Sequence, residues 1–397
     1  MFCKPHLNAS GITRISNILF FVGVIFCLLL IRRFKEDSEL NKLMIHSRFL
    51  HANLSTSKIV HTSDATSKQE IPQTSPESSK HAPIKRIIIF CYMRGGSSFI
   101  GQLFNANPNA FYLFEPLFIF KQTYYDTRVF HWTWKKASES VNSNIYTREF
   151  HEMGQTLLNL LECNFTFPYI IEQLKAGYSY SYLRNMEHNF GVHSQLKIFI
   201  KKSAKLFELF QTTDLHSIDR NVVENLCKRS SLNVAKTIRL LDIDYVSNLL
   251  HNDPNLHIIH LVRDPRAIHN SRKSMGYRSI STPDSICTPM IQNIIKGDRL
   301  QSHRYSLVKY EDFAMNPLSS SKMLYQKLGL GQLPDAVETW INENTNASTH
   351  KSSGLRLKTN SKEVALHWLT KISPENRMRF ENHTDCLKIF RRMNYVL

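Results

Sequence analysis

A short run of basic and small residues follows a strongly apolar segment of the chain. Lys85–Met93 (KRIIIFCYM) is typical of a strand buried on both faces of a parallel sheet. It leads into RGGSSF, which begins at Arg94, and Phe99–Asn105 then has apolar residues at helical spacing. Glycines leave backbone N–H groups free, so a strand, a glycine turn and a helix N-terminus together predict a phosphate cradle. By itself RGGSS favours an ordinary strand-to-helix turn over phosphate binding, and the neighbouring segments change that balance. It is not a Walker A loop, because GxxxxGK[ST] is absent and the basic residue precedes the glycines.

Two further segments place charged residues where buried strands are expected to end. Phe111–Phe114 (FYLF) runs into Glu115, and Leu256–Val262 (LHIIHLV) runs into Arg263. Ligands of open α/β sheets bind outside the carboxyl ends of the strands, so both side chains are expected in the crevice that holds Arg94. The planar guanidinium of Arg263 suits a phosphate. The alternative for Glu115 is a surface glutamate before a proline turn.

A helix is predicted directly after Arg263. Pro265 suits its first position, and Ser271 then lies about two turns into the helix, where it can meet the same anion. Asp264 and Arg266 are expected to form an ion pair with each other rather than to contact a ligand.

These motifs resemble those of the Golgi carbohydrate 6-O-sulfotransferases, which act on galactose, N-acetylglucosamine or N-acetylgalactosamine. The resemblance rests on MRGGSSF, GQLFNANPNAFYLFEPL and LVRDPRAIHNSR, and is supported by KTIRL, SLVKYEDFAMNPL and the ending FRRMNYVL. It extends from about residue 85 to the C-terminus and weakens between Phe118 and Ala235. The family loop usually reads Arg-Ser-Gly-Ser-Ser-Phe, and here Gly95 replaces the first serine.

The resemblance implies an α/β fold with a mainly parallel sheet flanked by helices, similar to P-loop kinases in topology. It also implies binding of 3'-phosphoadenosine 5'-phosphosulfate (PAPS) and transfer of its sulfuryl group to a sugar hydroxyl. The residues implied in binding PAPS are Arg94, Gly95, Gly96, Ser97, Ser98 and Phe99 at the 5' end, and Arg263, Asp264, Pro265, Arg266 and Ser271 in the 3'-phosphate segment.

Glu115 and Arg94 are the predicted catalytic residues. Glu115 is predicted to accept the proton of the sugar hydroxyl, and Arg94 to stabilise charge on the leaving phosphate. No metal is required by this scheme. His260 and His269 are alternative bases, but His260 alternates within a predicted strand and is interpreted as structural.

Other functions remain open on the sequence. The acceptor could be protein tyrosine, or the chain could bind sulfated glycans without catalysis. The net charge of +17 favours anionic partners. A nucleic-acid-binding module would show clustered basic runs, yet the only dense patch is Lys197, Lys201, Lys202 and Lys205, whose helical spacing predicts a solvated or glycan-facing face. A P-loop kinase is disfavoured by the missing Lys-[Ser/Thr].

The order of segments predicts a single-pass Golgi membrane protein with a lumenal enzyme domain. Residues 1–14 are the expected cytoplasmic tail, 15–31 the transmembrane anchor, 32–83 the stem and 84–397 the sulfotransferase domain. No small-residue cleavage site follows the anchor. Flanking charges favour the opposite orientation, but four sequons, at Asn53, Asn164, Asn346 and Asn382, all lie after the anchor and support this one.

Five of the seven cysteines follow the anchor, so at least one of them is free if that region is lumenal. The pairings that we expect are Cys287 with Cys386 and Cys163 with Cys227. No CxxC spacing is present, which disfavours a zinc site. The sequence leaves open whether the chain forms a homodimer through its stem or anchor.

Overall fold

The computed structural model describes residues 83–119, 144–166, 199, 201–214, 217–240, 242–301, 303–345 and 360–396. The predicted tail, the predicted anchor and all but the last residue of the predicted stem lie outside these ranges, as do Asn53, Lys197 and Asn346. In the described ranges no helix combines the length and the hydropathy that a membrane crossing needs.

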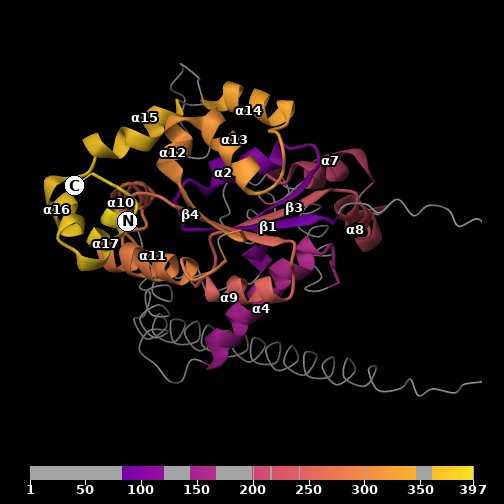
Figure 1. Ribbon diagram of the computed structural model, residues 1–397, viewed down its shortest axis with the longest axis horizontal. Helices are drawn as coiled ribbons and strands as arrows, with labels where there is room; N and C mark the ends of the chain where they lie inside the picture. Colours follow the sequence, from indigo (N-terminus) through magenta and orange to yellow (C-terminus); the bar gives the residue numbers. More distant parts are fainter. Residues whose placement is uncertain are drawn as a thin grey trace, which may run out of the picture. The chain divides into compact units, whose positions relative to one another are not determined.

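A fully parallel sheet of five strands forms the centre of the described region (Figure 1). The strands are β1 (Lys85–Cys91), β2 (Ala110–Phe114), β3 (Leu232–Thr237), β4 (Leu256–Val262) and β5 (Tyr305–Lys309), in the order β2-β3-β1-β4-β5. The predicted parallel α/β fold is confirmed. Strands β1, β2 and β4 lie where the apolar runs predict them, whereas β3 and β5 have no predicted counterpart.

Helices cover both faces of the sheet, as Figure 1 shows. One face packs against α2 (Ser97–Asn105), α12 (Tyr310–Met315), α13 (Pro317–Lys327), α14 (Asp335–Thr345) and α15 (Ser361–Leu366). The other face packs against α4 (Asn144–Leu161), α7 (Ala204–Thr212), α8 (Arg220–Lys228), α9 (Asp244–Ser247), α10 (Pro265–Ser274), α11 (Pro283–Gly297), α16 (Pro374–Glu381) and α17 (Thr384–Arg392). Short 3-10 turns lie at Pro116–Ile119, Asn248–His251 and His367–Thr370.

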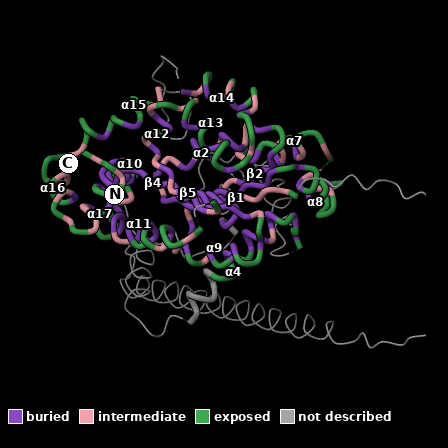
Figure 2. Tube along the Cα trace, viewed as in Figure 1, coloured by how far each residue is buried: buried purple, intermediate pink, exposed green. Residues whose placement is uncertain are grey.

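The alternation of side chains in β1 explains the two cores. Ile87 and Ile89 face the α2 side, while Ile88 and Phe90 face the α4 side, and all four are fully buried. Figure 2 shows the buried residues concentrated along the strands and the inward sides of the helices. Because apolar area is removed from water on both faces, the strands need no alternating polar residues.

Two disulfides join elements of the α4 side, and both expected pairings are confirmed. Cys163 pairs with Cys227, and Cys287 pairs with Cys386, which links α11 to α17. Cys91 is free and buried.

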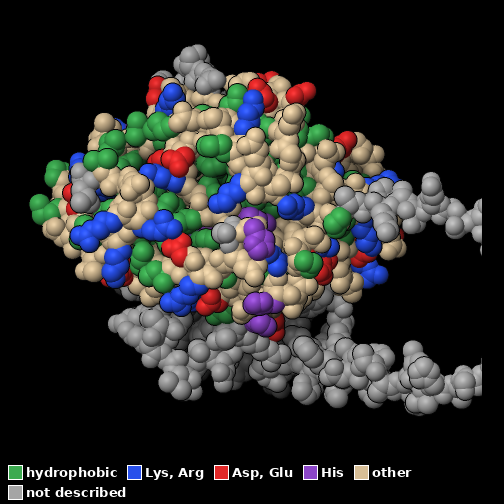
Figure 3. All heavy atoms as spheres, viewed as in Figure 1, with side chains coloured by type: hydrophobic (Ala, Val, Ile, Leu, Met, Phe, Trp, Pro, Cys, Tyr) green, Lys and Arg blue, Asp and Glu red, His purple; other side chains and the backbone are tan. Residues whose placement is uncertain are grey.

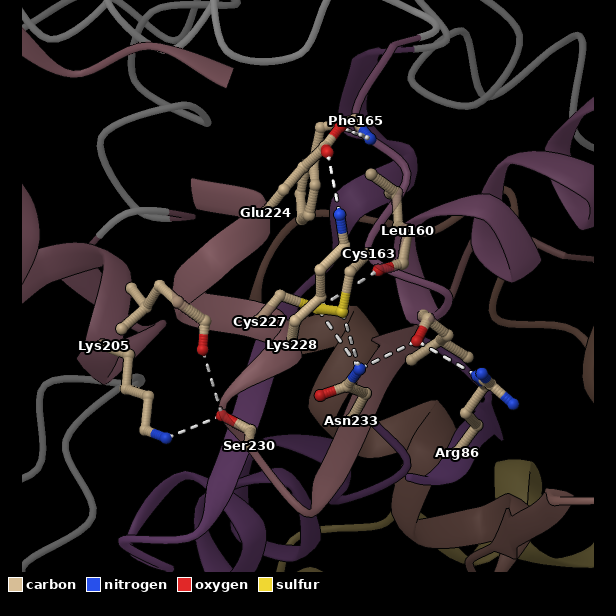
Figure 4. Close-up of a disulfide and its surroundings, with 12 residues drawn as sticks. Arg86, Leu160, Cys163, Phe165, Lys205, Glu224, Cys227, Lys228, Ser230 and Asn233 are labelled. Carbon is tan, nitrogen blue, oxygen red and sulfur yellow. Dashed lines mark hydrogen bonds and ion pairs between the residues drawn. A yellow bond between two sulfur atoms is a disulfide. The ribbon is translucent and has the colours of Figure 1, made fainter. Parts of the chain in front are cut away.

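A polar residue of strand β3 supports the first of these disulfides. The Asn233 amide donates to the Leu161 carbonyl at 2.8 Å and contacts the sulfurs of Cys163 and Cys227 at 3.1 and 3.2 Å (Figure 4). The amide therefore finds partners inside an otherwise apolar layer.

Candidate functional site

The loop between β1 and α2 adopts a conformation that exposes its backbone N–H groups. Arg94 and Gly96 have φ angles of 67° and 83°, in the left-handed region, and α2 begins at Ser97. Among the described residues, no acceptor lies within hydrogen-bond distance of the N–H groups of Gly96, Ser97 or Ser98. Free N–H groups at a helix N-terminus attract an anion.

A glycine is required at position 96. A Cβ there would lie 2.1 Å from the ring of Tyr310, the first residue of α12. The neighbouring Gly95 is held by a hydrogen bond from its N–H to the Tyr92 carbonyl at 2.9 Å. Phe99, in contrast, is 8% exposed and packs against Tyr310 and Trp340. Its side chain therefore belongs to the hydrophobic core.

Two arginines from different strands meet at this loop. Arg94 Nε donates to Ser271 Oγ at 2.9 Å, and Arg263 Nη1 donates to the carbonyl of Arg94 at 3.2 Å. The Arg263 guanidinium also lies over the Tyr310 ring, 4.6 Å from its centroid. Burial and the nearby positive charge of Arg263 lower the pKa of Arg94.

Neither arginine has a carboxylate within ion-pair distance among the residues that the structure describes. Arg263 is 8% exposed, and its Nε has no partner in the described region. Burying two adjacent cations without a counterion is unfavourable, so this arrangement is typical of a site completed by an anionic ligand.

The start of α10 holds Arg263 in place. The Asp264 carboxylate caps the helix by accepting from the Arg266 N–H at 2.8 Å, and Pro265 occupies the first helical turn. Arg266 forms the expected ion pair with Asp264 at 2.8 Å and a second with Glu381 at 2.7 Å. At 2% exposure its guanidinium is fully engaged by the protein. The side chains of Asp264 and Arg266 are therefore buried and stabilise the start of α10.

The C-terminal residues fasten the same turn. Glu311 accepts from the Asp264 N–H at 2.9 Å through one carboxylate oxygen and from the Tyr395 hydroxyl at 2.9 Å through the other. Burial raises the pKa of Glu311. The carbonyl of Val396 accepts from Arg266 at 2.7 Å. The chain end therefore helps to fix the backbone next to Arg263.

Glu115 lies at the end of β2 in a buried ion-pair cluster. Its φ is 54°, which is uncommon for a residue other than glycine. Its carboxylate accepts from Lys236 Nζ at 2.5 Å and from the Ile238 N–H at 3.1 Å, and Arg239 lies 3.7 Å away. Glu115 and Lys236 are 7% and 2% exposed.

Sequence reasoning did not identify Lys236 or Arg239 as site residues. KTIRL contributes only to the family resemblance, and the signal that identifies the two cations is their position at the end of a strand. An ionised carboxylate has about four acceptor positions, so the bonds from Lys236 and Ile238 leave room for a further donor on Glu115.

The strand order brings these groups to one edge of the sheet. The connection after β1 leads to β2 on one side of the sheet, and the connection after β4 leads to β5 on the other. The ends of β1 and β4 thus flank a topological switch point, where open α/β sheets bind ligands. Arg94 and Arg263 follow those two strands, and Glu115 follows β2.

The two histidines that were alternative bases are both engaged inside the protein. His260 is fully buried, and its ring nitrogens pair with the hydroxyls of Tyr92 at 2.9 Å and Tyr305 at 2.8 Å. Burial lowers its pKa to about 3, so the ring stays neutral, which confirms the structural interpretation. His269 bonds the Ser281 carbonyl and packs on Phe380.

The fold is that of a parallel α/β protein, and the switch point of its sheet carries a cluster of cations and free N–H groups suited to a phosphate-type anion. The family model described as "Sulfotransferase family" matches residues 86–335, and the chain belongs to this family. It is a PAPS-dependent transferase of sulfuryl groups. The expected family is therefore confirmed.

Curated relatives carry matching names. The chain is 27% identical over 364 residues to carbohydrate sulfotransferase 3 of Rattus norvegicus, covering 83% of this chain and 72% of the relative. It is 29% identical to carbohydrate sulfotransferase 1 of Danio rerio, covering 72% of each chain. A solved sulfotransferase domain from the Synechococcus PCC 7002 olefin synthase is 15% identical, covers 81% of this chain and 98% of its own, and has a TM-score of 0.43.

Proposed function

We propose that this chain transfers the sulfuryl group of PAPS to a carbohydrate hydroxyl, the 6-hydroxyl of N-acetylglucosamine, galactose or N-acetylgalactosamine. Its membership of the sulfotransferase family and the printed names of its curated relatives support this assignment. The proposal places the acceptor on a glycoprotein or proteoglycan glycan. The choice of the 6-position rests on the family resemblance.

The observation that carries the proposal is the pair of arginines without carboxylate partners. Arg94 and Arg263 follow adjacent strands, and Arg263 donates to the Arg94 carbonyl while Arg94 donates to Ser271. The buried Arg263 Nε has no partner in the described region. A nucleotide with phosphates at both its 5' and 3' positions supplies two anions that match two such cations. We assign the 5' end to Arg94 and residues 95–98, and the 3' phosphate to Arg263 and Ser271.

PAPS supplies an activated sulfuryl group, whose transfer to an alcohol resembles phosphoryl transfer in relying on positioning and charge stabilisation. In our proposal Arg94 and the N–H groups of Gly96, Ser97 and Ser98 stabilise negative charge on the leaving phosphate. An acceptor position still free on the Glu115 carboxylate lets it accept the hydroxyl proton. Lys236 holds that carboxylate in place through the 2.5 Å contact. No metal is part of the scheme.

We also propose that the protein is a single-pass type II membrane protein of the Golgi with its enzyme domain in the lumen. The anchor is residues 15–31. The two disulfides support this location, because structural disulfides persist in oxidising compartments. The exposed position of Asn164, in one of the sequons, is compatible with it.

The test is transfer of labelled sulfate from PAPS by the purified full-length protein to keratan, chondroitin and N-acetylglucosamine-terminated acceptors. Arg263→Ala should weaken donor binding at least about 100-fold, while Glu115→Gln should lower turnover by at least about 100-fold with nucleotide binding retained. Near-normal turnover of Glu115→Gln would remove it from the role of base. Failure of the wild-type protein to bind PAPS would refute the central proposal.

A further inference from the structure

Hydrogen bonds hold the turn before α7 against the end of β2, next to Glu115. Ser203 is fully buried, and its hydroxyl accepts from the Phe114 N–H at 3.1 Å and donates to the Phe199 carbonyl at 2.8 Å. The next residue, Ala204, donates its N–H to the Asn105 side chain at 2.8 Å. These bonds fix the position of the residue that precedes Ser203, which is Lys202.

The structure differs here from the helical face predicted for the lysine patch. Because α7 begins only at Ala204, Lys202 lies in the turn and does not share a helix with Lys205. Lys201 is exposed, and Lys205 donates to Ser230 at 2.7 Å. The lysines of the patch therefore have different surroundings, and Lys202 is the one that lies against Phe114.

The ammonium groups of Lys202 and Lys236 both lie close to the ring of Phe114 at the edge of the site. Lys202 Nζ lies 4.9 Å and Lys236 Nζ 4.0 Å from the centroid of Phe114. Lys236 is neutralised by Glu115 at 2.5 Å. For Lys202, the described part of the chain offers no carboxylate within ion-pair distance and no hydrogen-bond acceptor. Burial and the like charge of Lys236 lower its pKa.

Lys202 is a half-buried cation next to the proposed base, and among the described residues no carboxylate lies within ion-pair distance of it. Such a cation is suited to a negative charge from the ligand side. The phosphates of the donor are already matched in our proposal by Arg94 and Arg263. With a neutral sugar next to Glu115, the sulfuryl oxygens of the donor would be the only anionic group of the ligands left for Lys202. An acidic group on the acceptor would provide a partner through a charge-assisted hydrogen bond.

We propose that Lys202 forms a subsite for an acidic group of the acceptor glycan, so that the enzyme prefers an anionic chain to a neutral one. The inference rests on the proposed function and names the charge class of its acceptor. The acidic group is a uronate carboxylate or a sulfate ester on a sugar close to the one that receives the sulfuryl group.

The experiment compares two matched pairs of acceptors with the full-length protein. The first pair is an unsulfated N-acetylhexosamine–uronic acid hexasaccharide and the same hexasaccharide after reduction of its carboxylates to alcohols. The second pair is an N-acetylhexosamine–galactose hexasaccharide with and without sulfate esters on part of its sugars. Each is assayed for kcat/KM with wild type, Lys202→Met and the control Lys201→Met, which removes the same charge from the exposed neighbouring position.

Wild type and Lys201→Met should both prefer the charged member of at least one pair, and Lys202→Met should lose about tenfold in kcat/KM with that member only, at unchanged KM for PAPS. The pair that responds identifies carboxylate or sulfate. Equal use of charged and neutral acceptors by wild type would overturn the inference while leaving the proposed function intact. A raised KM for PAPS in Lys202→Met would also overturn it, because Lys202 would then serve the donor. Absence of PAPS-dependent transfer to every acceptor would instead refute the proposed function.

Discussion

Replacing Arg263 by methionine should separate ligand binding from stability. The guanidinium is 8% exposed, so its bonds to a phosphate are little screened by water. Charge-assisted hydrogen bonds contribute about 1.5–3 kcal/mol each, so losing a bidentate pair should cost at least about 3 kcal/mol. Because each tenfold change in Kd corresponds to about 1.4 kcal/mol, the Kd for adenosine 3',5'-bisphosphate should rise at least roughly 100-fold.

The same substitution should change the stability of the ligand-free protein only slightly. Arg263→Met removes two hydrogen bonds to carbonyls and the contact with Tyr310, but it also removes repulsion from Arg94 and a buried Nε without a partner. These opposing contributions are each about 1–2 kcal/mol, so the net change in the free energy of unfolding should be within about 1 kcal/mol.

Thermal unfolding with and without adenosine 3',5'-bisphosphate measures both quantities. At a ligand concentration of about 100 times the wild-type Kd, wild type should gain about 2.7 kcal/mol, and a variant with a 100-fold higher Kd only about 0.4 kcal/mol. A large loss of stability in the ligand-free variant would show that Arg263 is structural. Full retention of the ligand-induced shift would refute its assignment to the 3' phosphate.

Three further outcomes are expected. Gly96→Ala should abolish binding of adenosine 3',5'-bisphosphate in calorimetry, because its Cβ meets the Tyr310 ring at a positive φ; retained binding would mean that the loop can rearrange. Tyr395→Phe removes the bond to Glu311 and should raise the KM for PAPS several-fold at nearly constant kcat, whereas equal losses of folded protein and activity would indicate a stability effect alone. Cys91 should resist iodoacetamide in the native protein up to about pH 9, since burial raises its pKa to about 12. Carboxamidomethylation of Cys91, detected by mass spectrometry in protein that remains folded, would contradict this.

The sequence predicted those parts of the fold whose signals are local. The apolar runs at β1, β2 and β4 were recognisable because strands buried on both faces exclude polar residues. Strand β3 (LNVAKT) could not be predicted because it buries Asn233 and Lys236, whose partners Leu161, Cys163 and Glu115 are distant in sequence. Asn233 serves the disulfide between Cys163 and Cys227, and Lys236 serves Glu115.

The candidate site was predictable to a similar extent. Arg94 and Arg263 could be placed from the ends of their strands, and the ion pair between Asp264 and Arg266 followed from their spacing. The cluster around Glu115 could not be predicted, since Lys236 lies 121 residues further along the chain and only the strand order brings it near. On the face drawn in Figure 3 the basic and acidic side chains are interspersed.

The ring of Tyr310 links the two halves of the anion site. It fills the space that a side chain at position 96 would need, and it lies under the guanidinium of Arg263. A larger residue at Gly96 would displace the ring, and a smaller residue at position 310 would remove the support of the guanidinium. These three positions should therefore vary together or not at all during evolution. Homologues that lack the glycine should have lost the aromatic residue and the arginine as well, and with them the ability to bind the nucleotide.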